Sequence, residues 1–349
     1  MVSWYSSPGP LPLPSARVWA LVGRMNWLLP PFLLLCILSG CGPTDDSEPK
    51  PGETAPAPLP ADGLSATGGA SSTGGVDNDV ADALAEAVGK SASGADLDDM
   101  NVEQLLRKLL SAKNPDFNGQ AEFQTQCGMP VAISLAGTGV TDISMLADLP
   151  LMRLDLSNNP ISDLSALEGM PLRELFLENT RVTDLSPIEG SPLIQIFLNK
   201  TRVSSIKPLK GMPLKNIYLP DTRVKDLSPL RGMATLEGLW LNDTPVENIE
   251  PLRGLPLVTL TLRGTNVKDL SPLSVMPRLQ RLHIAESRVT DLTPVTQLRL
   301  TRLLFTPGRI NKGIDLVRRM PTLREIGDSL EGKLQPTVFW QQYDNGVYR

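Results

Sequence analysis

The chain contains few residues of the kinds that carry out chemistry. His283 is the only histidine among 349 residues, and the cysteines are Cys36, Cys41 and Cys127. Nucleophilic catalysis needs a hydroxyl or thiol held beside a base, and the sequence arranges no serine or cysteine around His283. Phosphate-loop, kinase and zinc-ligand motifs are also missing from the sequence. We therefore predict a binding protein rather than an enzyme, with no cofactor.

Acidic residues recur at a regular spacing and raise the question of a metal site. The repeating carboxylates are Asp142, Asp163, Asp184, Asp226, Asp269 and Asp291, with Ser205 and Asn248 at equivalent positions. A calcium site needs several oxygens that converge within one loop, whereas this pattern supplies one carboxylate per repeat. Asp, Ser and Asn also form turns and helix caps. The pattern therefore favours a structural role for these residues and predicts no metal site.

These residues belong to a unit of 21 or 22 residues that recurs from about position 131 to 327. Each unit begins with the pattern L-x-x-L-x-L. Eight clear copies begin at Leu151, Leu172, Leu193, Leu214, Leu236, Leu257, Leu279 and Leu300. With a degenerate copy before them and a partial copy after, they make about nine coils. A fixed period of this length indicates a solenoid, in which each unit buries its apolar side against its neighbours.

The unit predicts the path of each coil. Alternating leucines indicate a short strand with every second side chain inward, so stacked coils form a parallel sheet. A buried Thr or Asn in each repeat, such as Thr180, can pair with backbone groups where the strand turns. Ser-Pro pairs such as Ser186-Pro187 predict a helical turn with Ser as N-cap and Pro at N1. Glycines such as Gly190 suit its left-handed exit. There is no room for a longer helix, so we expect short 3₁₀ turns on the convex side.

The segment from Leu177 to Ile188 resembles the repeat unit of the internalin-like class of bacterial leucine-rich-repeat proteins, with Thr where Asn is usual. The resemblance covers about 200 of the 349 residues. It implies an α/β solenoid with a curved parallel β-sheet, and it gives little information about the partner.

Both ends of such a solenoid need a cover. We assign residues 79–130 to a helical segment and N-terminal cap. Within it, residues 99–112 predict an amphipathic helix that Asp98 or Asp99 could cap. Residues 131–327 form the repeats, and residues 328–349 form the C-terminal cap or tail. The apolar residues that we expect at the C-terminal end are Val317, Met320, Leu323, Ile326, Phe339, Trp340 and Tyr343.

The N-terminal sequence predicts export. The apolar run from Trp27 to Leu38 is too short to span a bilayer and suits a signal peptide in residues 1–40. Leu38-Ser39-Gly40-Cys41 resembles the lipobox of bacterial lipoproteins, which implies lipidation of Cys41. A plain secretory signal and a short anchor helix are the alternatives. Residues 41–78 then form a flexible tether rich in Pro, Gly, Ser and Ala. Gly42 follows the cysteine where retained lipoproteins have Asp, which favours the outer membrane of the cell envelope.

The net charge bears on the type of partner, and the cysteine content bears on the state of the one remaining thiol. The formal net charge is −5, and loss of a signal peptide that carries Arg17 and Arg24 would make it more negative. Nucleic acid binding calls for a basic surface, so we predict no nucleic acid partner. Cys127 would be the one unmodified cysteine of the mature chain, and we expect it to be a buried structural thiol rather than a reactive one. We expect a monomer.

The outward positions of the strands give the candidate binding residues. In four consecutive repeats the middle residue is aromatic: Phe176, Phe197, Tyr218 and Trp240. Arg263 and His283 follow on the same concave side, where His283 is either part of a binding patch or merely exposed. Aromatic residues with a polar rim are typical of protein-binding hot spots, so we predict an unidentified protein ligand. A glycan or cell-wall ligand is the alternative, because rings also stack on sugars. The rings could instead stack on each other and stabilise the sheet, which would suit a structural spacer.

Overall fold

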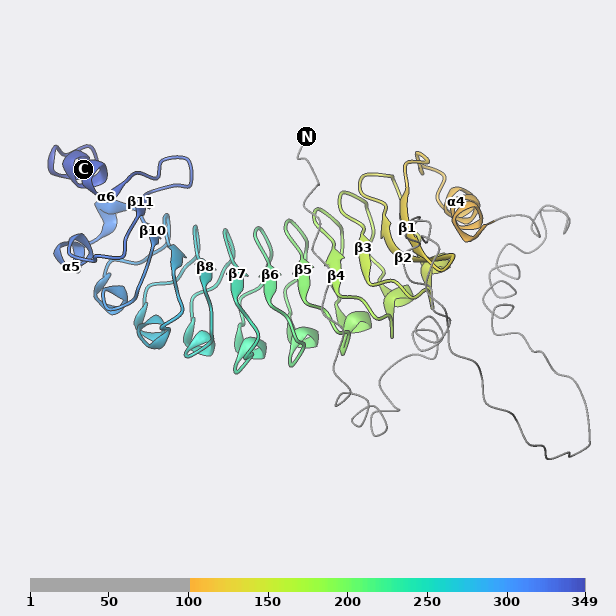
Figure 1. The fold of residues 1–349 in the computed structure, drawn as a ribbon, viewed down its shortest axis with the longest axis horizontal. Coiled ribbons are helices and arrows are strands. Elements are labelled where there is room, and N and C mark those ends of the chain that lie inside the picture. The colour runs from red at the N-terminus through yellow and green to blue at the C-terminus, as the bar shows by residue number, and fades with distance from the viewer. Residues whose placement is uncertain (1–100, 349) are drawn as a thin grey trace, which may run out of the picture. The chain divides into compact units, whose positions relative to one another are not determined.

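The computed structural model describes residues 101–348, which form one stack of coils between two caps (Figure 1). The predicted signal peptide, Cys41, the tether and most of the predicted helical segment lie outside the described residues. The strands are β1 (Glu122–Gln126), β2 (Met129–Ser134), β3 (Arg153–Asp155), β4 (Glu174–Phe176), β5 (Gln195–Phe197), β6 (Asn216–Tyr218), β7 (Gly238–Trp240), β8 (Thr259–Thr261), β9 (Arg281–His283), β10 (Arg302–Leu304) and β11 (Glu325–Gly327). The α-helices are α4 (Val102–Lys113), α5 (Ile314–Arg318) and α6 (Pro336–Asp344).

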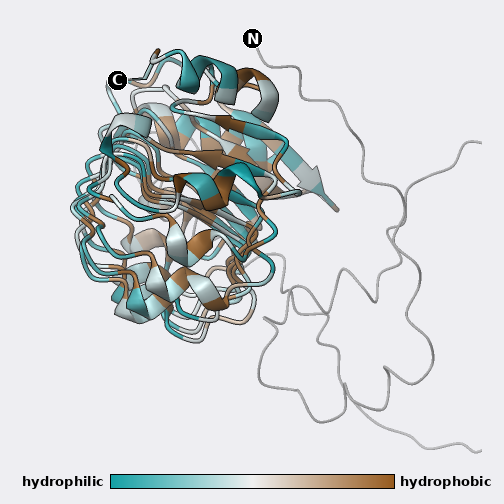
Figure 2. Ribbon diagram, turned by 90° about the vertical axis from the view of Figure 1, so that its left-hand side faces the viewer, coloured by the Kyte–Doolittle hydropathy of each residue, from teal (hydrophilic) through white to brown (hydrophobic). Residues whose placement is uncertain are grey.

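The strands form one sheet of eleven strands in sequence order. It is parallel from β2 to β11, and only β1 is antiparallel to its neighbour β2. In an end-on view the successive coils overlie one another, because each follows almost the same path (Figure 2). The predicted solenoid with a parallel sheet is therefore confirmed.

The core runs through the inside of the coils as columns of equivalent apolar residues. The strand column pairs Leu154 with Leu175 and Ile196 with Ile217, and all four side chains are fully buried. A buried aliphatic side chain contributes about 1.5–3 kcal/mol before chain entropy is subtracted. Since each coil repeats the same columns, the core is continuous from α4 to α6.

The backbone turns sharply at the end of each strand, and one buried hydroxyl holds this turn. Thr180 Oγ1 donates a hydrogen bond to the carbonyl oxygen of Leu177 at 2.7 Å. Equivalent bonds are made by Thr138, Thr201, Thr222, Thr244, Thr265 and Ser287. Asn159 uses its amide for the same purpose and also reaches Leu135 in the preceding coil. The predicted role of this buried polar position is confirmed.

Short 3₁₀ helices occupy the side of each coil opposite the strand turns. η10 (Pro307–Arg309) instead follows β10 closely, and α5 takes the equivalent place in that coil. The others are η2 (Ser144–Leu146), η3 (Ser165–Leu167), η4 (Ser186–Ile188), η5 (Lys207–Leu209), η6 (Ser228–Leu230), η7 (Glu250–Leu252), η8 (Ser271–Val275) and η9 (Thr293–Val295). They line the lower edge of the stack in Figure 1. The chain leaves five of these turns through glycines with φ between 74° and 78°, a conformation that favours glycine. Those glycines are Gly169, Gly190, Gly211, Gly232 and Gly254.

The predicted capping of these turns was wrong in one respect. Ser186 is the first residue of η4 and makes no cap, and Leu185 occupies the N-cap position. The capping group is Asp184, whose Oδ1 accepts the Ser186 N–H at 2.9 Å and the Ser186 hydroxyl at 2.7 Å. These bonds, led by the backbone N–H, lower the pKa of Asp184. The recurring aspartates therefore cap the turns, while the serines donate to them.

Helix α4 and a β-hairpin cover the first coil. The helix buries Leu106, Leu109 and Leu110. Asn101 forms a capping box with Gln104 at its start, so the predicted caps Asp98 and Asp99, which lie outside the described residues, are not needed. Hairpin strand β1 has no clear alternation in the sequence, and we did not predict it.

The hairpin turn places Cys127 in solvent, contrary to the predicted burial. Cys127 and Gly128 have φ values of 50° and 78°, and Gln126 pairs with Met129 on either side. A two-residue hairpin with two positive φ angles is the type I′ turn, which twists with the strands. Its central side chains project from the sheet, so the thiol cannot enter the core.

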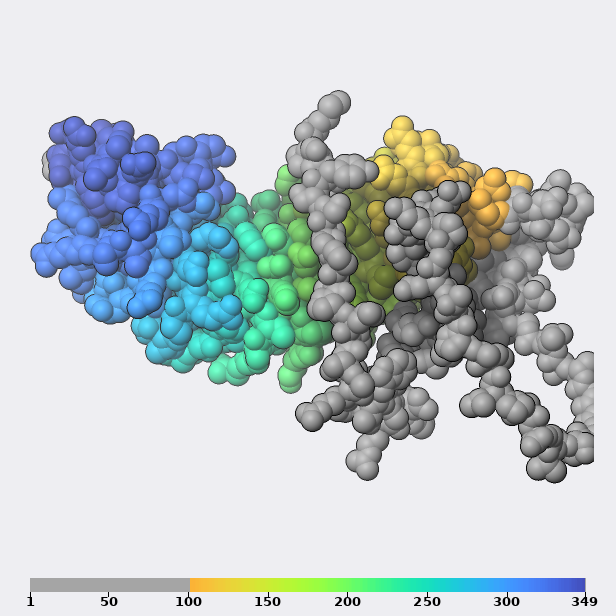
Figure 3. Space-filling view, viewed as in Figure 1, coloured from red at the N-terminus to blue at the C-terminus, as the bar shows by residue number. Residues whose placement is uncertain are grey.

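The C-terminal cap consists of α5, β11 and α6. Phe339 is fully buried and Trp340 nearly so, and the Phe339 ring lies 5.9 Å from the ring of Phe305 in the last coil. In the space-filling view the coils run from the green middle of the stack to this blue cap, and the yellow and orange N-terminal cap lies at the other end (Figure 3). None of the helices in residues 101–348 is long and apolar enough to cross a membrane.

Candidate binding surface

Four aromatic side chains form a continuous stack on the exposed face of the sheet. Phe176, Phe197, Tyr218 and Trp240 end strands β4 to β7 and pair in register. Successive ring centroids are 4.5, 4.1 and 4.0 Å apart, and successive ring planes differ by 10°, 9° and 10°. All four residues are half-buried. We call this set the aromatic ladder.

The stacking decides which part of each ring a ligand could touch. Both faces of Phe197 and Tyr218 lie against neighbouring rings. The guanidinium carbon of Arg153 lies 4.9 Å from the centroid of the Phe176 ring, next to the first ring of the ladder. Phe197 and Tyr218 can therefore offer a ligand only their ring edges and the Tyr218 hydroxyl.

The last ring of the ladder depends on a glycine. Gly238 precedes Trp240 by two positions on β7, so both face the same side of the sheet. A Cβ atom at Gly238 would lie 2.5 Å from the Trp240 atoms Cη2 and Cζ3 and 2.5 Å from Asn216 Oδ1. The indole ring therefore lies over the Gly238 backbone, in space that any other side chain would fill.

Amide and carboxylate side chains flank the ladder. Gln195 Nε2 donates to Glu174 Oε1 at 3.3 Å, and Asn216 Nδ2 donates to Gln195 Oε1 at 3.4 Å. On the other side, Asn199 Nδ2 donates to Glu178 Oε1 at 2.5 Å. Burial and then the charge of Asp155 raise the pKa of Glu178. The polar rim is thus cross-linked from coil to coil and holds its shape beside the rings.

Several buried polar atoms on this face have no hydrogen-bond partner among the described residues. They include Asn199 Oδ1, Asn242 Oδ1 and Thr261 Oγ1. Asn199 and Asn242 follow β5 and β7 by two residues, and Thr261 pairs with Trp240 in the next strand. An unpaired buried polar atom costs free energy.

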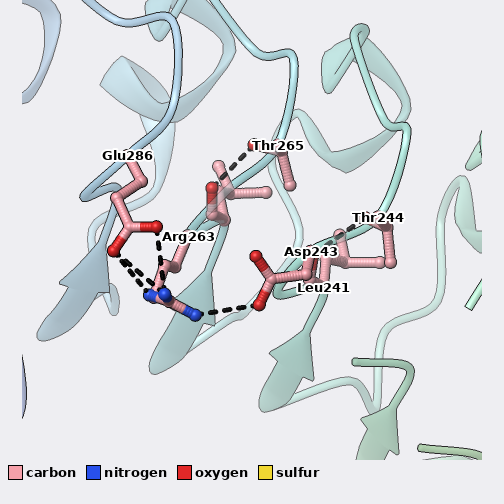
Figure 4. Close-up of polar contacts among 7 residues, drawn as sticks. Leu241, Asp243, Thr244, Arg263, Thr265 and Glu286 are labelled. Carbon is pink, nitrogen blue, oxygen red and sulfur yellow. Dashed lines mark hydrogen bonds and ion pairs between the residues drawn. The ribbon is translucent and has the colours of Figure 1, made fainter. Parts of the chain in front are cut away.

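Arg263 does not stand free on the concave face. Its Nη1 lies 2.9 Å from Asp243 Oδ2 and its Nη2 lies 2.9 Å from Glu286 Oε1 (Figure 4). The hydrogen bonds to Glu286, followed by the Asp243 charge, raise the pKa of Arg263. The guanidinium therefore joins the turns that follow β7, β8 and β9 along one edge of the sheet. Its role in partner binding stays a prediction, and its charge is already paired with these two carboxylates.

His283 is buried, whereas we expected it on an accessible surface. It is 6% exposed, and Leu304, the equivalent residue of β10, is fully buried. Burial, and then the charge of Arg263, lowers the pKa of His283 to about 4. The backbone of Asp328 hydrogen-bonds to His283, so the C-terminal cap covers this position. The sequence pattern could not reveal this, because the covering segment follows the repeats.

No group of three or more His, Cys, Asp or Glu side chains in residues 101–348 is arranged to hold a metal ion. The recurring aspartates lie one per coil, and the two oxygens of Asp226 each accept from Ser228. Their structural interpretation therefore has a direct hydrogen-bond basis.

Comparison with solved structures identifies the class of fold. An internalin (inlF) from Listeria monocytogenes superposes with a TM-score of 0.52 at 24% sequence identity, over 72% of this chain and 69% of that one. An internalin C2 (inlC2) from the same organism superposes with a TM-score of 0.50 at 27% identity, over 65% of this chain and 92% of that one. No protein-family model and no curated protein sequence matches this chain. The fold is the leucine-rich-repeat solenoid of the internalin type, as the repeat predicted.

Proposed function

We propose that the protein is a non-catalytic binding module that holds a protein partner on its concave face, around the aromatic ladder. The supporting observation is the half-buried aromatic ladder, which is flanked by hydrogen-bonded polar side chains. Interface hot spots are rich in aromatic residues within a polar rim. Arg263 belongs to the edge of this surface, and His283 lies beneath the cap and takes no direct part.

A protein partner suits the ladder better than a glycan does. A sugar ring packs on the face of an aromatic ring, and the faces of Phe197 and Tyr218 are occupied by their neighbours. Ring edges and a tyrosine hydroxyl instead offer apolar contact and one hydrogen-bonding group, which a protein surface can meet.

The concave face also differs in charge along its length. Asp155 and Glu178 lie near its N-terminal coils, where Glu174 is paired with Arg153. Arg281 lies on β9, and Arg302 on β10 is paired with Glu325. A partner with basic residues facing the N-terminal coils and acidic residues facing β9 and β10 would bind in one orientation. In the reversed orientation, like charges would face each other, which is unfavourable.

Photocrosslinking with the full-length chain tests the proposal. A benzoylphenylalanine at position 218 would be activated in envelope extract, beside a control with the same group at Leu316, which is exposed on α5. We expect one protein to crosslink from position 218 and to disappear when Phe176, Phe197 and Trp240 are changed to serine in a folded variant. Equal crosslinking from both positions, or a sugar-containing product, would refute the proposed protein partner.

We further propose that the solenoid is exported and anchored in the bacterial cell envelope through lipidated Cys41. The support is the lipobox-like sequence and the tether-like composition that follows it. Mass spectrometry of the N-terminal peptide should find a diacylglycerol on Cys41, and Cys41→Ser should move the protein to the soluble fraction. An unmodified Cys41 in a membrane-bound protein would exclude the lipid anchor and leave the binding proposal intact.

A further inference from the structure

A groove with arginine side chains crosses the last coils, away from the ladder. It encloses about 560 Å³ and includes Arg278, Arg299 and Arg324 in its lining. Gln280, Thr301 and Arg324 precede strands β9, β10 and β11 directly, so the groove lies at the edge where these strands begin. Arg263 and its carboxylates lie at the opposite edge, where strands end.

The groove has excess positive charge. Its lining contains no acidic residue. Arg278 lies 3.7 Å from Glu237, a long ion pair between two exposed side chains. Within residues 101–348, neither Arg299 nor Arg324 forms an ion pair, and both are exposed. By contrast, the neighbouring Arg302 on β10 is paired with Glu325.

The sequence departs from its own repeat at this place. The residue before the first leucine of the unit is proline in five coils, at Pro150, Pro171, Pro192, Pro213 and Pro256. In the coils that line the groove it is Arg278, Arg299 and Thr322, and Arg278 and Thr322 each directly follow a proline, Pro277 and Pro321. Arginine therefore occupies this position only in the two adjacent coils that begin at Leu279 and Leu300, among the coils from Leu151 to Leu323.

The arrangement fits a phosphate group better than a carboxylate. Neighbouring strands lie about 4.8 Å apart, so Arg278 and Arg299 extend from points one coil apart. A phosphate monoester carries up to about two negative charges and three acceptor oxygens, and guanidinium groups bind phosphate through paired N–H donors. One phosphate can therefore accept from two guanidinium groups at once, which a single carboxylate does less well.

A smaller hollow continues the groove, and about half of its lining is apolar. It encloses about 250 Å³, shares Pro277 and Arg299 with the groove, and is also lined by Val275 and Leu298. Val275 is 50% exposed. A ligand with a phosphate and an apolar part would fill both hollows.

We propose that this groove is a second binding site, which takes the phosphate monoester group of a small molecule or of a lipid headgroup. It shares no residue with the aromatic ladder, so either site can exist without the other.

Isothermal titration calorimetry of the full chain tests the site with two probes, inorganic pyrophosphate and water-soluble dihexanoylphosphatidic acid. The groove variant is Arg299→Gln with Arg324→Gln. The matched control is Arg202→Gln with Arg223→Gln, because both are exposed arginines without an ion pair in the described part of the chain. Gln280→Glu is a nearly isosteric second variant that adds an acid to the groove and does not depend on removing an arginine.

We expect saturable binding of at least one probe, a loss of about tenfold or more in the groove variant and in Gln280→Glu, and no change in the control. Tighter binding of the phosphatidic acid would identify a lipid headgroup, and tighter binding of pyrophosphate a soluble phosphate. The absence of saturable binding for both probes would overturn the proposal. An equal loss in the control would also overturn it, because the effect would then be one of net charge.

Discussion

At the scale of single residues, the concave face is shaped by a few close contacts that the repeat pattern does not contain. The four aromatic positions were predictable, because their alternation with buried leucines places them on one face. Their stacking at 4.0 to 4.5 Å could only be considered as one alternative, since spacing fixes the side of the sheet and not the ring orientation. The burial of His283 depends on a loop from the C-terminal cap and could not be predicted from the repeat.

Substitution of Gly238 by alanine should displace the Trp240 ring. The new Cβ would lie 2.5 Å from the indole, and overpacking of this kind costs about 1–3 kcal/mol. We expect a lower free energy of unfolding in urea and a changed near-ultraviolet circular dichroism signal. Gln195→Ala, at the equivalent position of β5, is the control and should leave the indole signal unchanged. An unaltered signal in Gly238→Ala would show that the ring has room elsewhere.

His283 should make the solenoid less stable as the pH falls. Its pKa is about 4 in the folded protein and about 6.5 in the unfolded chain, so the unfolded state binds the proton more readily. The stabilising contribution is complete above pH 6.5 and declines towards pH 4, at about 1.4 kcal/mol per pH unit at most.

Urea unfolding at pH 7 and pH 5 measures this contribution. The loss of stability between the two pH values should be smaller in His283→Gln than in the native chain, because the glutamine does not titrate. The same loss in both proteins would mean that His283 is not responsible for it.

At the scale of elements, the coils were predictable and the caps only in part. Each coil repeats the same inward leucines and buried threonine, so nine imperfect copies reinforce one another. The N-terminal cap has a single copy of its sequence. Its helix was predicted from the spacing of Leu106, Leu109 and Leu110. Strand β1 was not predicted, because most of its side chains are exposed and its sequence resembles that of a loop.

Asn114 should be the residue that holds α4 on the first coil. It is 1% exposed. Its Nδ2 donates to the carbonyl oxygens of Leu110 and Asp142, and its Oδ1 accepts the backbone N–H groups of Thr141 and Asp142. Asn114→Ala leaves these buried groups unpaired, so we expect a loss of about 2–4 kcal/mol.

Hydrogen exchange locates this effect. Amides of α4 should lose protection in Asn114→Ala while the central coils keep theirs. Asn118→Ala is the control, because Asn118 makes weaker bonds at the surface, including one of 3.3 Å to the Gly137 carbonyl oxygen. A similar loss in both variants would contradict a special role for Asn114.

At the scale of the described solenoid, stability depends on contacts between neighbouring coils. Each coil contacts the one before and the one after, and the two caps close the ends of the core. The fold class could be predicted from the repeat alone, because each coil contacts only its neighbours. The candidate binding surface could not be predicted in full without the structure, because the ring contacts join several coils and because the C-terminal cap buries His283.

Phe339→Ala should therefore weaken one end of the stack first. The Phe339 ring is fully buried and lies 5.9 Å from Phe305 and 4.9 Å from Trp340. Its removal should cost about 3–5 kcal/mol. Hydrogen exchange should rise in β9 to β11 and at His283, with little change in β3 to β5. Uniform loss of protection along all coils would mean that the solenoid unfolds as a single unit.

The glycine beneath Trp240 also constrains how this surface could have arisen. A tryptophan that appears at 240 while a larger residue occupies 238 meets a collision, whereas a glycine at 238 is compatible with a smaller ring at 240. The two substitutions therefore have a permitted order, with glycine before tryptophan. Reversal follows the opposite order, so the tryptophan must be lost before the glycine can change. Selection that retains Trp240 would therefore also retain Gly238.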